Sequence, residues 1–414
     1  MTSTLIAVLL ALLPLSAPPP ASRPEITLTA QETSIVLTEE ALRIHRSGLL
    51  IDGHNDLLWK IRSKADSSFD KMDISQPQKT LQTDIPRLRR GGVGAQFWAA
   101  YVPPSEEHTG RAAQIALEEF DLLDRMMARY PETFELATSA DDIERIHRTG
   151  KIASLLGVEG GHTIEKSLDT LALFYQRGAR YLGLTHSAST DWADSCTDKP
   201  RHGGLAPFGE QVIREMNRLG MLVDISHTSH DCMRDVLRVS RAPVIDSHAG
   251  AFAVAAHPRN VPDDVLRMLK ANGGIVMVTF FPGYIHPEGA KAMMDFFEQE
   301  RIIKSQGLSP DEAARAWRAW KEAHPIPAGT VQTVVDHIDH IVGLIGIDYV
   351  GLGSDYDGVG IMPVQLEDVS GFPCITQELH NRGYTAEDIH KIMGKNFLRV
   401  MREAERIARE LQKQ

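Results

Sequence analysis

The chain has 414 residues, of which 43% are hydrophobic and 24% charged, an ordinary balance for a globular protein with a sizeable core. Asp and Glu number 55 against 44 Lys and Arg, which gives a formal net charge of -11. This acidic balance argues against a nucleic-acid-binding protein and favours a soluble protein that acts on small molecules. The length fits two average domains or one large α/β barrel.

The N-terminal residues have the pattern of an export signal. Residues 1–21 contain a short apolar run followed by small residues and prolines, which predicts a signal peptide and a secreted or periplasmic protein. No Lys or Arg precedes the apolar run, so a short uncleaved anchor, and with it a membrane-associated protein, is the alternative. Residues 22–47 are expected to form a linker and a helix over 38–46.

The three cysteines are widely separated in the sequence. Cys196, Cys232 and Cys374 have no CxxC spacing and allow at most one disulfide bond. We expect them to be three cysteines that bind no metal.

From residue 48 to residue 414, short apolar runs alternate with segments of helical periodicity, which predicts one catalytic domain. The predicted strands are Leu49–His54, Val93–Tyr101, Ile152–Val158, Ala179–Thr185, Met221–Ser226, Ala242–Ser247, Gly274–Phe280 and Tyr349–Ser354. Helices are predicted over Ala112–Arg129, Phe208–Leu219 and Val331–Ile345. Near-continuous apolar strands separated by helices indicate a parallel sheet covered on both faces. Eight such units favour a (β/α)8 TIM barrel. The alternative is a doubly wound open sheet, but no Gly-x-Gly-x-x-Gly follows a strand.

One interval between predicted strands is longer than the others. The insertion at about 281–348 contains Ser309-Pro310-Asp311-Glu312, a favourable helix start, and predicts an extra helix over Ala313–His324. We interpret the insertion as a lid or a homodimer surface, with a simple packing insertion as an equal alternative.

Polar residues that can bind metal or transfer protons follow most of the predicted strands. They are His54 and Asp56, Glu159, His186, His227, His248 and Asp355. Because the carboxyl ends of the strands in such a barrel carry its catalytic groups, this repeated placement predicts a metal site.

The candidate ligands are His54, Asp56, Glu159, His227 and His248, three imidazoles and two carboxylates. This mixture suits zinc, and manganese or cobalt would also accept it. Five protein ligands are too many for one tetrahedral zinc with an open position, so two ions sharing a carboxylate are expected. Glu159 lies between the two groups in chain order and is the natural bridge.

Several motifs together resemble one family. They are Asp52-Gly-His-Asn-Asp56, Gly157-Val-Glu-Gly-Gly-His162, Leu184-Thr-His186, Ile225-Ser-His227, Pro243-Val-Ile-Asp-Ser-His248, Arg259-Asn-Val-Pro-Asp-Asp264 and Gly353-Ser-Asp-Tyr-Asp-Gly358. Their order and spacing, over about residues 48 to 400, resemble the membrane (renal) dipeptidase family, zinc peptidases on an amidohydrolase-like barrel.

The resemblance implies a role for each site residue. His54 and Asp56 would bind one zinc, His227 and His248 the other, and Glu159 would bridge both. His186 would polarise the scissile carbonyl, and Asp355 would hold and shuttle the proton of the bridging water. Arg259 would pair with the C-terminal carboxylate of a dipeptide, and Tyr284 falls where the family has a substrate-pocket tyrosine. An arginine suits bidentate carboxylate recognition, and a carboxylate near the water suits proton transfer.

The chain departs from the animal members in two respects. The C-terminal residues are polar, without a lipid-anchor signal, and Ser187-Ala188 stand where vertebrate members carry a disulfide cysteine. We therefore expect that bridge to be absent.

The sequence predicts a metallo-dipeptidase that hydrolyses dipeptides with a free C-terminal carboxylate by a water activated between two zinc ions. The alternative enzyme is another binuclear amidohydrolase, acting on an N-acyl amino acid or a lactone. A non-catalytic binding protein would be expected to carry a broken ligand set, whereas all five ligands and Asp355 are present.

Overall fold

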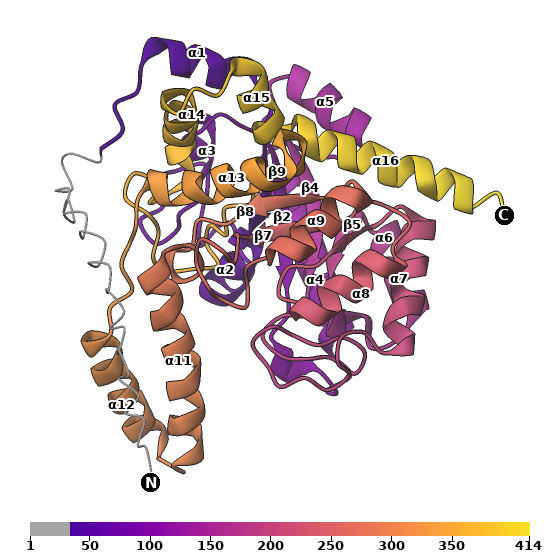
Figure 1. The fold of residues 1–414 in the computed structure, drawn as a ribbon, viewed down its shortest axis with the longest axis vertical. Coiled ribbons are helices and arrows are strands. Elements are labelled where there is room, and N and C mark those ends of the chain that lie inside the picture. The colour runs from indigo at the N-terminus through magenta and orange to yellow at the C-terminus, as the bar shows by residue number, and fades with distance from the viewer. Residues whose placement is uncertain (1–33) are drawn as a thin grey trace, which may run out of the picture. The chain divides into compact units, whose positions relative to one another are not determined.

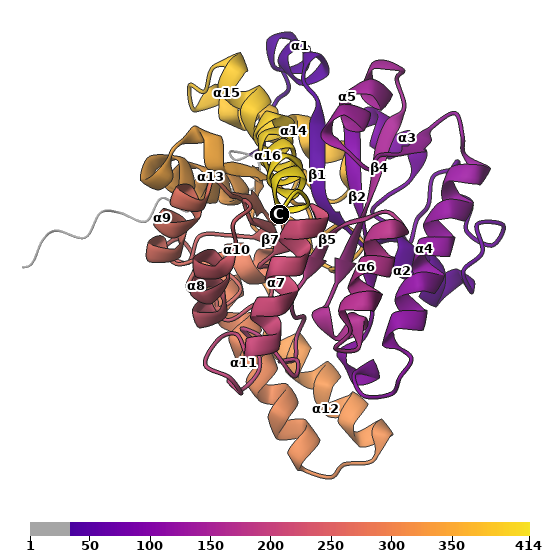
Figure 2. The same ribbon diagram turned by 90° about the vertical axis from the view of Figure 1, so that its right-hand side faces the viewer.

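Eight parallel strands close into a barrel in the computed structural model, which describes residues 34–414. The predicted signal peptide and the first part of the predicted linker lie outside the described residues. The barrel strands are β1 Leu50–Asn55, β2 Val93–Tyr101, β4 Ile152–Glu159, β5 Ala179–Gly183, β6 Leu222–Asp224, β7 Ile245–Ala249, β8 Ile275–Val278 and β9 Val350–Leu352. Figures 1 and 2 show these strands in the middle of the fold, with helices around them.

The strand order follows the chain around the barrel. Neighbours run β2-β1-β9-β8-β7-β6-β5-β4, and β2 pairs with β4 to close the circle. This closing pair is in continuous register from Ala95 opposite Ala153 to Tyr101 opposite Glu159. The closure confirms the predicted barrel and rules out the open doubly wound sheet. One short strand, β3 Phe134–Leu136, was not predicted and extends the sheet beside β4, outside the barrel.

The helices pack outside the strands, and several begin at a capping residue that the sequence supplies. They are α1 Glu39–Ser47, α2 Leu57–Ala65, α3 Ile85–Arg90, α4 Ala112–Arg129, α5 Ala140–Arg148, α6 Leu168–Gln176, α7 Pro207–Leu219, α8 His230–Val239, α9 Asp263–Asn272, α10 Pro282–Ile285, α11 Pro287–Ser305, α12 Pro310–Ala323, α13 Val331–Ile345, α14 Phe372–Asn381, α15 Ala386–His390 and α16 Asn396–Leu411. Thr38, Ser139 and Ser229 each accept a hydrogen bond from the first turn of the helix that follows. The predicted helices over 38–46, 112–129, 208–219 and 331–345 are all present.

The core has two apolar clusters, as expected for a barrel wrapped in helices. The larger cluster joins strand residues such as Trp98 and Val158 to the surrounding helices. The second joins alternate strand residues, among them Phe97, Leu155 and Met277, to α16. Because these residues lie before the carboxyl ends of their strands, the second cluster fills the barrel below the candidate site.

The insertion forms a helical hairpin. Its second helix, α12, confirms the predicted extra helix and begins with a capping box at Ser309; its first helix, α11, was not predicted. Phe296 on α11 packs on Trp317 of α12, with ring centroids 4.5 Å apart. Figure 1 shows the two helices side by side, away from the strands. No residue of α12 is buried.

Among residues 34–414, no helix combines the length and the apolar character that a membrane span requires. Cys196, Cys232 and Cys374 are all free thiols.

Candidate active site

The polar residues predicted at the strand ends lie together at the carboxyl end of the barrel. Glu159, the last residue of β4, is central: its carboxylate lies 3.0 Å from His227 Nε2, 3.6 Å from His248 Nε2 and 3.7 Å from His54 Nε2. On one side, His54 Nε2 is 3.3 Å from Asp56 Oδ2. On the other, the Nε2 atoms of His227 and His248 are 3.0 Å apart. Residues distant in sequence therefore form one cluster with Glu159 between two ligand pairs.

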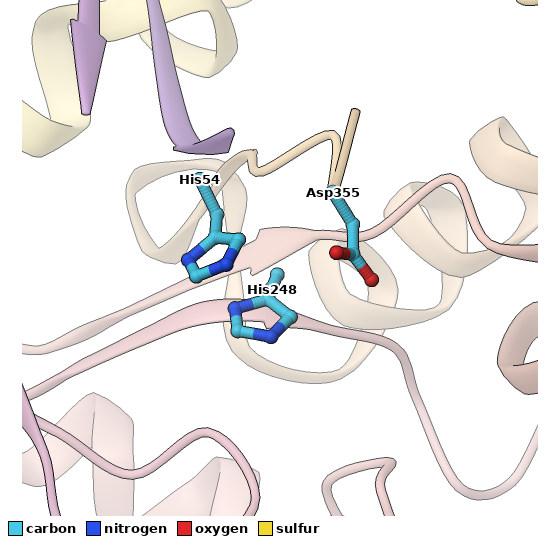
Figure 3. Close-up of side chains that lie close together, drawn as sticks. All are labelled: His54, His248 and Asp355. Atoms are coloured by element: carbon cyan, nitrogen blue, oxygen red, sulfur yellow. The ribbon is translucent and has the colours of Figure 1, made fainter. Parts of the chain in front are cut away.

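Asp355, directly after the eighth predicted strand, adds a further carboxylate to the cluster. One of its oxygens lies within 4.8 Å of ligand nitrogens of both His54 and His248. Figure 3 shows the two imidazoles stacked, at a centroid distance of 3.8 Å, with the Asp355 carboxylate beside them.

The side chains of this cluster fit a bound cation. His54 Nε2 is buried and has no hydrogen-bond partner in the protein. Buried polar atoms normally have a partner, so an unpaired imidazole nitrogen facing two carboxylates indicates that something else binds there. Three overlapping groups of ligand atoms lie within 4.8 Å of one another: His54, Asp56 and Glu159; Glu159, His227 and His248; His54, His248 and Asp355. Imidazole and carboxylate ligands are those that divalent transition metals prefer.

A buried serine and a buried tyrosine orient the two stacked histidines. Ser247 Oγ lies 2.8 Å from His248 Nδ1 and donates to Asp224 at 2.7 Å. The serine oxygen therefore accepts the Nδ1–H, and the Nε2 atom of His248 carries no proton. Tyr181 Oη lies 2.9 Å from His54 Nδ1 and can do the same there. Such partners fix the tautomer of a metal-binding histidine and raise its basicity.

Asp52, like Asp224 a buried aspartate, supports the part of the site that contains His54 and Asp355. Asp52 accepts hydrogen bonds from the backbone N–H of Ser354 at 2.7 Å and from Ser354 Oγ at 2.7 Å. Gln96 donates to the same carboxylate at 2.9 Å. Because Ser354 precedes Asp355 and Asp52 precedes His54 by two residues, these bonds couple the positions of two cluster members.

Burial and neighbouring charge shift the pKa values of the cluster strongly. Burial raises the pKa of Glu159 to about 8 and that of Asp355 to about 7. Burial alone would lower the pKa of His54, but the carboxylates of Asp56 and Glu159 raise it to about 10. These raised pKa values mean that protons offset the repulsion between the carboxylates when no metal is bound. A bound cation would take the place of those protons.

The other histidines of the site remain neutral. Burial, together with the charge of Arg259, lowers the pKa of His186 to about 3. The pKa values of His227 and His248 are lowered in the same way, by burial first. Neutral imidazole is the form that binds a metal, and the form that can donate one hydrogen bond while accepting another.

A cavity of about 330 Å³ opens onto the cluster. His186, Trp59 and Tyr101 line one part of it, and His186 Nε2 is 3.7 Å from Glu159. The Tyr101 ring packs between those of Trp59 and His186, at centroid distances of 5.0 and 4.8 Å. This volume would admit a small molecule whose polar centre lies over the cluster.

Arg259 is fully buried and lies behind Tyr284, which lines the cavity. The guanidinium carbon is 5.1 Å from the centre of the Tyr284 ring. One guanidinium nitrogen donates to the backbone oxygen of His248 at 2.9 Å, while Nε and Nη1 have no partner. Arg259 thus places a positive charge with unused donors next to the cavity.

Gly358 lies where the chain approaches the site too closely for a side chain. A methyl group at this position would collide with Asp56 Oδ2 and Asp355 Oδ1. In the same turn, Asp355 adopts a φ of 67°, the left-handed region that most side chains avoid. His227 also adopts a φ of 67°. The backbone is therefore strained at two site positions, as is common where function fixes a side chain.

Several of these residues have roles that the sequence alone does not indicate. Asp52 and Asp224 precede His54 and His227 by two and three positions, a repeated signal that could have identified them as supports. Ser247 and Tyr181 gave no such signal, because Asp224, which orients Ser247, and His54, the partner of Tyr181, lie on other strands.

Comparison with known proteins gives consistent matches. Residues 38–414 match the family model described as membrane dipeptidase, peptidase family M19. Dipeptidase 3 of Mus musculus is 40% identical over 376 residues, which cover 90% of this chain and 67% of that protein. Dipeptidase tcpJ of Claviceps purpurea (strain 20.1) is 40% identical over 367 residues, covering 86% of this chain and 77% of that protein. The crystal structure of the probable dipeptidase PvdM from Pseudomonas aeruginosa has a TM-score of 0.77 at 26% identity, covering 89% of this chain and 98% of that one.

Proposed function

Because this chain belongs to the membrane dipeptidase family M19, we propose that it hydrolyses the peptide bond of dipeptides with a free C-terminal carboxylate. One observation carries the proposal: a buried cluster of imidazoles and carboxylates opens onto a cavity of about 330 Å³. A cavity of this size favours a short substrate over an extended peptide.

We propose that the cluster holds two zinc ions. His54 and Asp56 would hold one, His227 and His248 the other, and Glu159 both. When bound, the ions would lower the pKa of a water molecule and polarise the peptide carbonyl. The central position of the Glu159 carboxylate, within 3.0 to 3.7 Å of imidazole nitrogens from both pairs, supports the bridging role.

The remaining residues would handle the proton and the substrate. Asp355 would accept the proton of the attacking water and return it to the amine nitrogen as the C–N bond breaks. His186, neutral and beside Glu159, would donate a hydrogen bond to the carbonyl oxygen as negative charge develops on it. The charge of Arg259 behind Tyr284 would attract the C-terminal carboxylate.

The decisive experiment combines metal analysis with a substrate panel. Purified protein should contain close to two zinc ions per chain and hydrolyse small dipeptides. Asp355→Asn and His227→Ala should each lower kcat at least about a thousandfold, since each removes a group that touches reacting atoms or metal. Asp348→Asn and His340→Ala are the matched controls: Asp348 pairs with Lys391, and His340 is hydrogen-bonded to Asp263, both outside the cavity.

Two outcomes would contradict the proposal. Hydrolysis by metal-free protein would exclude the metal cluster as the active site. Hydrolysis of N-acyl amino acids or lactones without any dipeptide activity would indicate the alternative amidohydrolase.

We further propose that the protein is exported and loses residues 1–21, on the basis of the apolar run and the small residues that follow it. N-terminal sequencing of the mature protein, purified from a cell that exports it, would test this. A retained Met1 in a membrane fraction would favour the uncleaved anchor instead.

We also propose that the α11–α12 hairpin forms a homodimer surface. Met294, Ile302 and Leu308 are exposed on it, by 48%, 40% and 36%. Light scattering on purified protein should give the mass of a dimer, and the double substitution Met294→Ser, Ile302→Ser should give a monomer. A dimer that withstands both substitutions would place the interface elsewhere.

A further inference from the structure

The turn that carries Asp355 is held by a residue from a distant part of the chain. Gln82 lies in the irregular segment before α3, and three hydrogen bonds join it to residues 357–359. Its backbone N–H donates to Asp357 Oδ1 at 2.9 Å, and its side-chain oxygen accepts from the Asp357 N–H at 2.6 Å. Its side-chain amide donates to the Val359 oxygen at 3.1 Å.

The segment containing Gln82 is itself fixed to the first half of the site. Thr83 Oγ1 accepts a hydrogen bond at 2.8 Å from the side chain of Asn55, which lies between His54 and Asp56. The backbone oxygen of Gln82 also accepts a hydrogen bond from the Val369 N–H at 3.1 Å. Gln82 is therefore held in place through Thr83 and through its own backbone oxygen, and it links the end of β1 to the turn after β9.

The linked turn has little freedom to move without disturbing the site. Asp355 N–H donates to the His54 oxygen at 3.2 Å, and Asp56 N–H donates to the Tyr356 oxygen at 2.9 Å. At Gly358 there is no room even for a methyl group between the turn and the carboxylates of Asp56 and Asp355. A small displacement of this turn would therefore change the distance between the proton-transferring carboxylate and the ligand pair on β1.

We propose that Gln82 is a positioning residue, which sets the place of the Asp355 carboxylate over the cluster by clamping the backbone of residues 357–359. Gln82 does not line the cavity, so its effect on the reaction passes through Asp355. The inference rests on the proposed role of Asp355 in dipeptide hydrolysis.

The test is the substitution Gln82→Ala in the full-length, zinc-loaded protein. Both side-chain hydrogen bonds, from the Asp357 N–H and to the Val359 oxygen, are lost, while the bond from the Gln82 backbone N–H to Asp357 Oδ1 stays. Backbone amides of residues 356–359 should therefore exchange with solvent about tenfold faster by hydrogen–deuterium exchange. The kcat for dipeptides should fall about tenfold with KM changed by less than about twofold, because orientation of a reacting group is lost while substrate contacts remain.

Gln377→Ala is the matched control. The Gln377 side chain is buried and accepts hydrogen bonds from the Thr38 N–H at 2.7 Å and from Thr38 Oγ1 at 2.9 Å, between α1 and α14. It should lower stability as much as Gln82→Ala, with unchanged kcat and unchanged exchange at residues 356–359. If Gln82→Ala does not fold, Gln82→Glu replaces it: the acceptor for Asp357 stays, while the donor to Val359 is lost and a carboxylate is placed beside Asp357.

The proposal is overturned if exchange at residues 356–359 does not change, or if Gln82→Ala lowers kcat no more than Gln377→Ala does. If the unsubstituted protein hydrolyses no dipeptide, the proposed function fails, and the exchange of residues 356–359 alone decides whether Gln82 clamps the turn.

Discussion

The carboxyl end of the barrel and the α11–α12 hairpin are built in opposite ways. At the barrel end, His54, Glu159 and His248 are almost fully buried, and their supports include residues of other strands, such as Tyr181 for His54 and Asp224 behind Ser247. In the hairpin, no residue of α12 is buried, and the Ser309 capping box is formed within four consecutive residues. The difference teaches that polar groups need many non-local partners to be held inside a protein, whereas a helix at the surface can be specified locally.

Removal of the metal should have the largest effect on the barrel end. A chelator should abolish dipeptide hydrolysis and lower the Tm. A metal that binds only the folded state stabilises that state, and its removal leaves the buried carboxylates close together without a cation between them. Activity and thermal unfolding, measured before and after zinc is added back, check this. A chelated protein with full activity and an unchanged Tm would mean that no metal binds at the cluster.

The substitution Gly358→Ala should lower kcat/KM about a hundredfold, since the new methyl group would displace the carboxylates of Asp56 and Asp355. Gly360→Ala, two residues later, is the control, because a Cβ there meets nothing within 4 Å. Steady-state kinetics of both variants on one dipeptide provides the measurement. Equal kinetics for the two would show that the turn accommodates a side chain.

His337 connects the two regions and should make stability depend on pH. Its Nδ1 accepts from the Ala251 N–H after β7, and its Nε2 donates to the Ile285 oxygen just before α11, both at 2.8 Å. Burial lowers its pKa from 6.5 to about 4. Since the folded pKa lies below the unfolded one, the stabilisation is present above pH 6.5 and is lost as the pH falls towards 4.

The expected loss from this one histidine is at most about 3 kcal/mol of unfolding free energy. Urea unfolding between about pH 7 and pH 4 should show a flatter loss for His337→Gln than for the unsubstituted protein, with His340→Gln as the control. Parallel curves for all three proteins would assign the acid sensitivity to other groups.

The smallest effect is expected in the hairpin. Trp320 stacks on His324 at a centroid distance of 4.5 Å and packs near Trp317. Trp320→Ala should therefore increase hydrogen exchange in α12, lower overall stability by about 1 kcal/mol or less, and leave kcat unchanged. A fall in kcat would instead indicate that the hairpin takes part in the reaction as a lid.

The sequence predicted the barrel because its signals repeat. All eight predicted barrel strands are present, since each is a compact apolar run and most are followed by a polar residue. The strand β3 was missed because three residues, Phe134–Leu136, are too few to show a period. The helix α11 was missed because its apolar residues do not lie on one face and only Gly289, Ala290, Met293 and Ile303 are buried.

The site was predicted by residue type and place, but its support was not. Strand ends of a barrel must converge, so His54, Glu159 and His248 could be grouped before their distances were known. Tyr181 and Ser247 could not be recognised, because Tyr181 contacts His54 on another strand and Ser247 depends on Asp224 of the neighbouring strand. Arg259 shows a further limit: no sequence pattern indicates that its guanidinium lies behind Tyr284 rather than on the cavity wall.

The position of β9 has a consequence for how the protein is made. This short strand lies between β8 and β1 and places Asp355 beside His54, about 300 residues earlier in the chain. During synthesis the candidate ligands on β1, β4 and β7, and His227 just after β6, emerge long before β9. Such long-range closure is slow, so a nascent chain exposes unfinished strand edges until its last quarter has been translated. Asp355, the proposed proton-transfer residue, therefore joins the site only when β9 has taken its place between β8 and β1.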